Sequence, residues 1–271
     1  MLTNIIIFTL VIIVVAYLWN SYNKANKKEW TAVDAAFSEA WKAILLKNVS
    51  FYDALTNEQK INFEKQVLTF LHNVKITGVK TSISDEDKLM VAASAIIPIF
   101  GFPNWQYPNV REVLIYPNSF DDDFQFEGND GEKQILGMVG NKHMDGVVIL
   151  SQKALRLGFQ NETDKKNTAI HEFVHLIDMS DGNVDGIPAV IMDKQYAMPW
   201  VDLIHKEINR IYENESDINP YGATNNAEFL AVISEYFFER PDLLEKKHPK
   251  LYALLEKTFN QDMDEHYKKM K

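Results

Sequence analysis

The first twenty positions form the most continuous apolar stretch of the chain. No charged side chain occurs from Leu2 to Trp19, and large aliphatic residues fill most of this segment. At roughly 1.5 Å per residue it would extend about 27 Å, enough to cross a thin bilayer core. The alternatives are a cleaved signal peptide, for which a basic start and a small-residue cleavage site are missing, and a buried core helix, which would carry a polar face. We therefore predict a transmembrane anchor over residues 1–20.

Basic residues follow this apolar segment, whereas none precedes it. Lys24, Lys27 and Lys28 come soon after it, and basic flanks favour the cytoplasmic side of a membrane. Residues 21–29 are therefore expected to form a basic juxtamembrane linker. Residues 30–271 are expected to form one domain that faces the cytoplasm, so that the chain is a single-pass protein of the cell membrane.

After residue 29 the pattern becomes that of amphipathic helices. Apolar residues recur at spacings of three and four over residues 30–45, which predicts a first helix. The segment 56–59 has the form of a capping box ahead of a second helix, and Ser84 starts a third that should stop near Pro98. The helical pattern returns after residue 150 and continues to the C-terminus.

Short β-branched runs interrupt the helices in the middle of the chain. Residues 113–116 and 147–150 are bounded by turn-forming residues and predict strands, while residues 135–139 are a weaker candidate. The expected fold class is α+β, a mainly helical domain with a small β-sheet. The strand that ends near Ser151 has two interpretations: a purely structural strand, or an edge strand that pairs with an extended peptide.

Composition narrows the chemistry that this chain can perform. Its 38 acidic and 28 basic residues give a formal net charge of −10, which repels phosphate backbones, so nucleic acid is not an expected partner. The sequence contains no cysteine. Disulfides, thiolate metal sites and cysteine nucleophiles are therefore excluded, and a transition metal would have to bind His, Asp or Glu.

The strongest chemical signal is the sequence His171-Glu172-Phe173-Val174-His175. On a helix, residues four positions apart project from one face, so both imidazoles can bind one cation. Glu172 points in a neighbouring direction, where its carboxylate can act as a general base. The alternative is a pair of surface histidines. However, the apolar neighbours of the motif predict burial, and buried imidazoles need polar partners.

A catalytic zinc site needs a third protein ligand and an open coordination position. Glu228 is the candidate, because it falls in the first turn of a helix predicted to end at Pro241, among apolar residues where an unpaired charge is unfavourable.

Two further acidic residues are candidates for supporting the metal ligands. Asp178, three residues after His175, is predicted to accept a hydrogen bond from a ligand imidazole, with a solvated position or service as third ligand as alternatives. Glu235, seven residues after Glu228, either supports a ligand or belongs to a core ion pair. The remaining histidines, including His248, are expected at the surface or in packing contacts.

Several stretches of the chain resemble the Mlc titration factor A family of zinc-dependent peptidases, and the layout of HExxH followed by a glutamate is similar to the catalytic domain of anthrax lethal factor. The resemblance covers most of residues 29–262 in the expected order. The matching stretches are residues 96–102 with Trp105 and Tyr107, 111–117, 148–151, 171–178 with Gly182 and 185–188, Tyr221 with 227–229, 234–241, and His248 and Pro249 with Leu251 and Tyr252.

The resemblance implies a role for each matched site residue. His171, His175 and Glu228 would bind Zn²⁺, Glu172 would be the general base, and Tyr221 would stabilise the developing oxyanion, as in a gluzincin. It also implies hydrolysis of peptide or protein substrates, with aminopeptidase-like activity. Some members bind a sugar-responsive transcriptional repressor, so a regulatory binding protein with incidental peptidase activity is the alternative function. The apolar N-terminal segment lies outside the family pattern.

Overall fold

The computed structural model describes residues 14, 30–118, 137–139, 146–161, 163–263 and 268. The chain divides into two units, Met1–Trp30 and Thr31–Lys271, and the second carries the fold described below. The predicted anchor over residues 1–20 and the linker over 21–29 lie outside the described residues, apart from Val14. Within the part of the chain that is described, no helix is long and apolar enough to cross a membrane.

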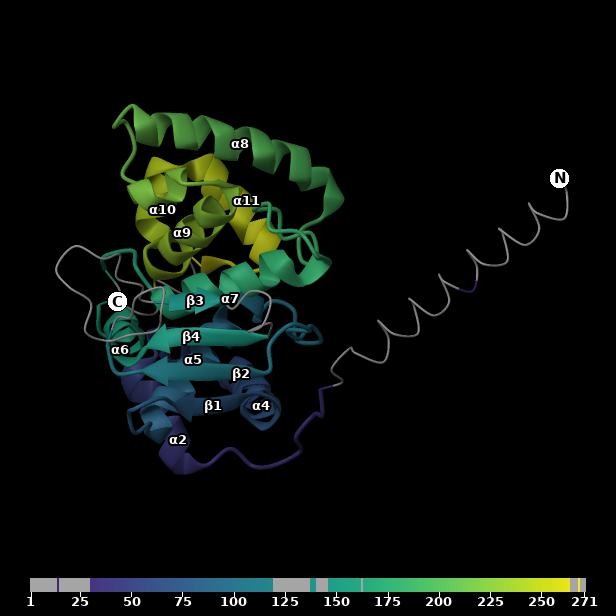
Figure 1. Ribbon diagram of the computed structural model, residues 1–271, viewed down its shortest axis with the longest axis vertical. Coiled ribbons are helices and arrows are strands. Elements are labelled where there is room, and N and C mark those ends of the chain that lie inside the picture. Colours follow the sequence, from purple (N-terminus) through teal and green to yellow (C-terminus); the bar gives the residue numbers. More distant parts are fainter. Residues whose placement is uncertain are drawn as a thin grey trace, which may run out of the picture. The chain divides into compact units, whose positions relative to one another are not determined.

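Helices dominate the second unit, and a small sheet interrupts them, so the fold class is α+β as predicted (Figure 1). The helices are α2 (Glu39–Asn48), α3 (Ser50–Asp53), α4 (Asn57–Asn73), α5 (Asp85–Ile99), α6 (Gln152–Gln160), α7 (Thr168–Asp178), α8 (Lys194–Tyr212), α9 (Asn226–Glu239), α10 (Pro241–Lys247) and α11 (Pro249–Phe259). Two short 3₁₀ turns are η2 (Met179–Asp181) and η3 (Pro220–Ala223), and the strands are β1 (Lys75–Gly78), β2 (Glu112–Tyr116), β3 (Gly137–Val139) and β4 (Val147–Ser151).

The predicted helix starts are correct where a side chain caps the backbone. The capping boxes at Thr56 and Ser84 begin α4 and α5. The prediction of a helix from residue 30 is wrong, because α2 begins only at Glu39, after Ser38 caps it. The preceding segment is non-helical, and Asn73 of α4 hydrogen-bonds both the N–H and the carbonyl of Thr31. These tertiary hydrogen bonds replace the local ones of a helix.

The sheet has the order β1-β2-β4-β3. Strands β1, β2 and β4 are parallel, and β3 pairs antiparallel with β4. Both runs predicted as strands are found, and β3 falls inside the weaker candidate. The interpretation of β4 as an edge strand is wrong, because β2 and β3 occupy both of its backbone edges. Strands β1 and β3 lie at the two edges of the described sheet instead.

Helix α7 lies between the sheet and the C-terminal helices (Figure 1). It contacts β3 and β4 of the sheet, α5 and α6 beside them, and α9 on its other side. The opposite face of the sheet carries a small apolar cluster around Tyr116 and Ile149. Helix α7, which carries His171 and His175, therefore lies at the centre of the fold and contacts both the sheet and the C-terminal helix α9.

Candidate metal centre

The two histidines of the motif lie on α7, one turn apart on the same face. Asn167 caps this helix, because its side-chain oxygen accepts a hydrogen bond from the backbone N–H of Ile170. Only 11% of the His171 side chain and 13% of the His175 side chain are exposed. This burial excludes the alternative of two surface histidines.

Glu228 comes from α9, which packs against α7. Asn225 caps α9 by accepting a hydrogen bond from the backbone N–H of Glu228. Glu228 Oε2 lies 3.0 Å from His171 Nε2 and 3.4 Å from His175 Nε2. The two Nε2 atoms are 3.1 Å apart. The structure therefore brings together the three side chains that were predicted to share a metal.

These separations suit ligands of one small cation. With metal–ligand distances of about 2.0 to 2.1 Å, two ligands at a tetrahedral angle lie roughly 3.3 to 3.4 Å apart. The observed separations run from 3.0 to 3.4 Å. Among the described residues, His171, His175 and Glu228 are the group of metal-binding side chains close enough to hold an ion.

Glu235 orients the ring of His171. It is buried on α9, two turns after Glu228, and its Oε1 accepts a hydrogen bond from His171 Nδ1 at 2.8 Å. Its Oε2 accepts the backbone N–H of Asn167, the residue that caps α7. Because Nδ1 faces Glu235, Nε2 is the ring nitrogen of His171 that faces Glu228 and His175. Two roles were predicted for Glu235, support of a metal ligand or membership of a core ion pair. Its contact with His171 is that of a residue that supports a ligand.

Two carboxylates lie against the His171 ring and favour a positive charge on it. Burial by itself lowers the pKa of His171, but the carboxylates of Glu228 and Glu235 reverse this effect and raise it well above its usual range. Burial raises the pKa of Glu228, but hydrogen bonds from His171 and His175 outweigh it and hold that pKa below its usual range. Two imidazole nitrogens and one carboxylate oxygen that converge on one point form a donor set that fits a divalent metal.

Glu172 and Tyr221 flank the three predicted ligands. Burial raises the pKa of the Glu172 carboxyl group, although the imidazoles of His171 and His175 oppose the shift. Tyr221 on η3 is 45% exposed, and its ring centroid lies 6.1 Å from that of His171. Burial, followed by the charges of Glu228 and Glu172, raises the pKa of Tyr221. Its phenol therefore keeps its proton at neutral pH and can donate a hydrogen bond.

Asp178 makes a different contact from the predicted one. Its Oδ2 accepts the backbone N–H of Gly186 at 3.0 Å, and no described residue hydrogen-bonds its Oδ1, so the expected bond to an imidazole is not formed. Trp200 donates to the Gly186 carbonyl, and the α-carbon of Gly186, at φ +76°, packs on the backbone of Asn226. Asp178 thus holds the loop after α7 against the first turn of α9, which carries Glu228.

Sequence reasoning missed the contacts that fix α7 against α9. Asn167 carries a usable signal, because an asparagine directly before a helix is a candidate N-cap. No sequence signal predicts the hydrogen bond between Asn167 and Glu235, because the two residues are 68 positions apart. The Gly186 contact with Asn226 is likewise a property of the packed structure.

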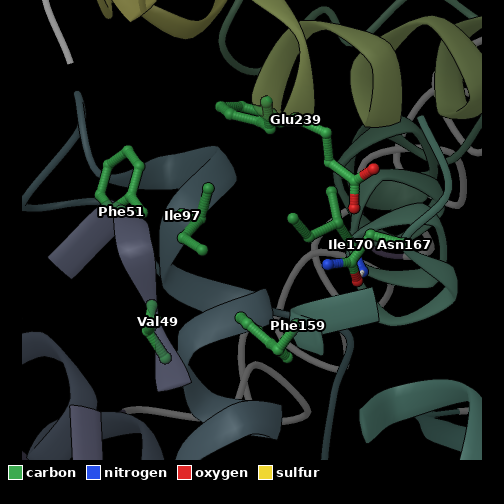
Figure 2. Close-up of a pocket in the computed structure, with 8 residues that line it drawn as sticks. Val49, Phe51, Ile97, Phe159, Asn167, Ile170 and Glu239 are labelled. Carbon is green, nitrogen blue, oxygen red and sulfur yellow. Dashed lines mark hydrogen bonds between the residues drawn. The ribbon is translucent and has the colours of Figure 1, made fainter. Parts of the chain in front are cut away.

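A small internal cavity lies beside the start of α7 (Figure 2). Its volume is about 30 Å³, which is enough for a single water molecule. The cavity is therefore too small for a substrate. The lining is mostly apolar, with Asn167 and the Glu239 carboxylate as polar members; the residues are Val49, Phe51, Ile97, Phe159, Asn167, Ile170, Phe238 and Glu239.

Two motif histidines and a glutamate from a later helix, next to a small sheet, are the arrangement of a metallopeptidase. The family described as "Glucose-regulated metallo-peptidase M90" matches residues 22–260, and the chain belongs to this family.

Relatives agree with this assignment. An uncharacterized protein of Synechocystis sp. is 28% identical over 269 residues, covering 96% of this chain and 97% of the relative. Mlc titration factor A of Pectobacterium atrosepticum is 25% identical over 233 residues, covering 83% of this chain and 86% of its own length. Mlc titration factor A of Yersinia enterocolitica is 31% identical over 160 residues, covering 56% and 59% respectively. The predicted family resemblance is confirmed.

Proposed function

We propose that this protein is a zinc-dependent peptidase that hydrolyses peptide bonds. The observation that carries the proposal is the convergence of His171, His175 and Glu228 within 3.4 Å of one another. Two imidazoles and one carboxylate, without thiolates, form a donor set suited to Zn²⁺. When bound there, the metal supplies a Lewis acid and a water molecule of lowered pKa.

Glu172 is the proposed general base. Its burial raises the pKa of its carboxyl group, which makes the carboxylate a stronger base than one in water. It takes a proton from the attacking water and later passes that proton to the leaving amine. Tyr221 donates its phenolic hydrogen bond to the negative charge that develops on the carbonyl oxygen of the substrate.

The decisive substitution is Glu172→Gln, which keeps the size of the side chain and removes the base. We expect kcat to fall by about 10²- to 10⁴-fold, while elemental analysis finds as much zinc as in the unaltered protein. Peptide hydrolysis at the unaltered rate by the metal-loaded Glu172→Gln protein would refute the assignment of the base. Absence of hydrolysis in the unaltered protein, tested on a mixed peptide library that includes free N-termini, would refute the peptidase function and its aminopeptidase form.

A second candidate function is the binding of a transcriptional repressor. It is supported by the relatives whose name, Mlc titration factor A, describes titration of another protein. Glu172→Gln separates the two functions. If a cellular phenotype of the gene persists in this variant, binding is the function, and if the phenotype disappears with hydrolysis, the peptidase is.

The predicted membrane anchor also remains a proposal. The family match begins at residue 22, just after the apolar stretch of residues 1–20, so the anchor would be an addition to the peptidase domain. With the domain in the cytoplasm, added protease should leave it intact in whole cells and digest it in inverted vesicles. Protection in both preparations would contradict this orientation, and release of the full chain into the soluble fraction would contradict the anchor.

A further inference from the structure

Strand β3 is one of the two edge strands of the sheet as described, and it contacts α7. Gly137, its first residue, faces the turn of α7 that carries the proposed base. A Cβ atom at this position would lie 2.7 Å from Glu172 Oε1, 2.8 Å from Glu172 Cγ and 2.7 Å from Thr168 Cγ2. Nonbonded carbon atoms prefer to lie about 3.5 to 4.0 Å apart, so any side chain here would overlap α7.

The backbone conformation does not explain this glycine. The described glycines with positive φ are Gly146, Gly182 and Gly186, and Gly137 is not one of them. It is instead in regular antiparallel pairing with β4, opposite Leu150. Alanine could adopt this strand conformation without strain, so the close approach of α7 is what leaves space only for hydrogen.

Thr168 and Glu172 form the notch into which Gly137 fits. They are four positions apart on α7 and therefore lie on the same face, one turn apart. A Cβ atom on Gly137 would meet the Thr168 methyl group and both the methylene and the carboxylate of Glu172. The strand backbone thus limits where the Glu172 carboxylate can move.

We infer that Gly137 is a positioning residue for Glu172, an inference that rests on the proposed peptidase function. Because position 137 has no side chain, Glu172 occupies the space next to the strand backbone. A methyl group at position 137 would overlap the Glu172 carboxylate and push it away from the strand. The base would then be displaced while the ligands keep their own supports, which for His171 is Glu235.

The test is Gly137→Ala in the full-length, zinc-loaded protein, with Val139→Ala as the matched control. Val139 lies two residues along the same strand, and its change adds no atoms. We expect Gly137→Ala to lower kcat by about 10- to 100-fold, because a displacement of about 1 Å in a catalytic group has effects of this size. KM should stay within about twofold and zinc content should be unchanged, and Val139→Ala should retain the unaltered kcat.

A second change distinguishes positioning from general damage to the sheet. Thr168→Ser removes the Cγ2 atom from the opposite wall of the notch, so the added methyl group can shift towards it. The double variant Gly137→Ala/Thr168→Ser should regain at least about a third of the lost activity on a logarithmic scale. If Gly137→Ala does not fold, Thr168→Ile tests the same contact from the helix side and should lower kcat with zinc still bound.

Three outcomes would overturn the inference: an unaltered kcat in metal-loaded Gly137→Ala, a loss of zinc that accounts for the loss of activity, or no recovery in the double variant. Each is distinguishable from failure of the proposed function. If the proposed peptidase function is wrong, the unaltered protein and Val139→Ala will both lack hydrolysis, and the inference about Gly137 will fail with it.

Discussion

Two clusters of histidine and carboxylate side chains lie next to α9, and they differ in the source of their positive charge. In the Asp217 cluster, Lys165 and Lys247 each donate to Asp217 Oδ2 at 3.0 Å, Tyr236 donates to it at 2.8 Å, and His248 Nε2 lies 2.9 Å from Oδ1. Burial raises the pKa of Asp217, but hydrogen bonds from His248, Tyr236, Lys247 and Lys165 hold it well below its usual range.

The second cluster, around His171, Glu228 and Glu235, has no lysine or arginine among its described partners, so only imidazoles face its carboxylates. Among the described residues, no lysine or arginine forms an ion pair with Glu172, Glu228 or Glu235. The adjacent residues Glu235 and Tyr236 of α9 face the two clusters separately. A buried group that the protein itself neutralises is structural, whereas one that lacks its counter-charge indicates a ligand.

The largest effect expected from this comparison is on metal binding. Glu228→Ala removes a proposed ligand, and we expect zinc affinity to fall by more than about 100-fold, which exceeds the loss typical for residues that only support a ligand. Competition with a chromogenic chelator measures the affinity. Asp217→Asn is the matched control and should leave it unchanged. Equal affinities in Glu228→Ala and the unaltered protein would remove Glu228 from the site.

The second effect is on stability and concerns the Asp217 cluster. Asp217→Asn deprives two lysines of their partner, and because the Asp217 side chain is still 25% exposed, we expect a loss of about 2 to 3 kcal/mol, less than for a fully buried pair. Urea unfolding at pH 7 measures it. Since the folded-state pKa is lowered, this stabilisation is present above the unfolded pKa of about 4 and lost as the pH falls. A constant difference between the two proteins down to pH 2 would contradict this account.

Removal of the support for His171 should have a smaller effect than removal of a ligand. Glu235→Ala leaves the ring without its Nδ1 acceptor, and we expect zinc affinity to fall by about 10- to 100-fold. Glu235→Gln retains an acceptor oxygen and should lose less. Zinc titration of both variants tests this order, and equal losses would mean that the negative charge, rather than the hydrogen bond, is what Glu235 contributes.

The smallest effect is a pH dependence at Asp178. Burial raises the pKa of this carboxyl group to about 6, so its protonated form is favoured in the folded protein. Stability is therefore lost as the pH rises through about 6, by about 1 kcal/mol between pH 5 and pH 7. Asp178→Asn keeps an acceptor for Gly186 and carries no charge. Its stability relative to the unaltered protein should increase over this pH interval, and a constant difference would refute the shift.

The sequence pattern was sufficient to predict the structure wherever the interacting residues are close together in the chain. The capping boxes of α4 and α5, the strands β2 and β4, and the one-turn separation of His171 and His175 all follow from interactions within a few residues. Backbone geometry sets these distances before any packing occurs. Glu228 was also found from the sequence, because a carboxylate among apolar residues at a helix start needs a partner.

Only the tertiary structure decided which distant groups meet. It placed Glu235, rather than Asp178, against an imidazole. It also placed β4 inside the sheet, with β1 and β3 at the two edges. It also gave His248, for which either a surface or a packing position was expected, a buried position next to Asp217. Such partners are tens of residues apart, so their meeting depends on how α7, α9 and the sheet pack together, and the periodicity of one segment carries no information about another.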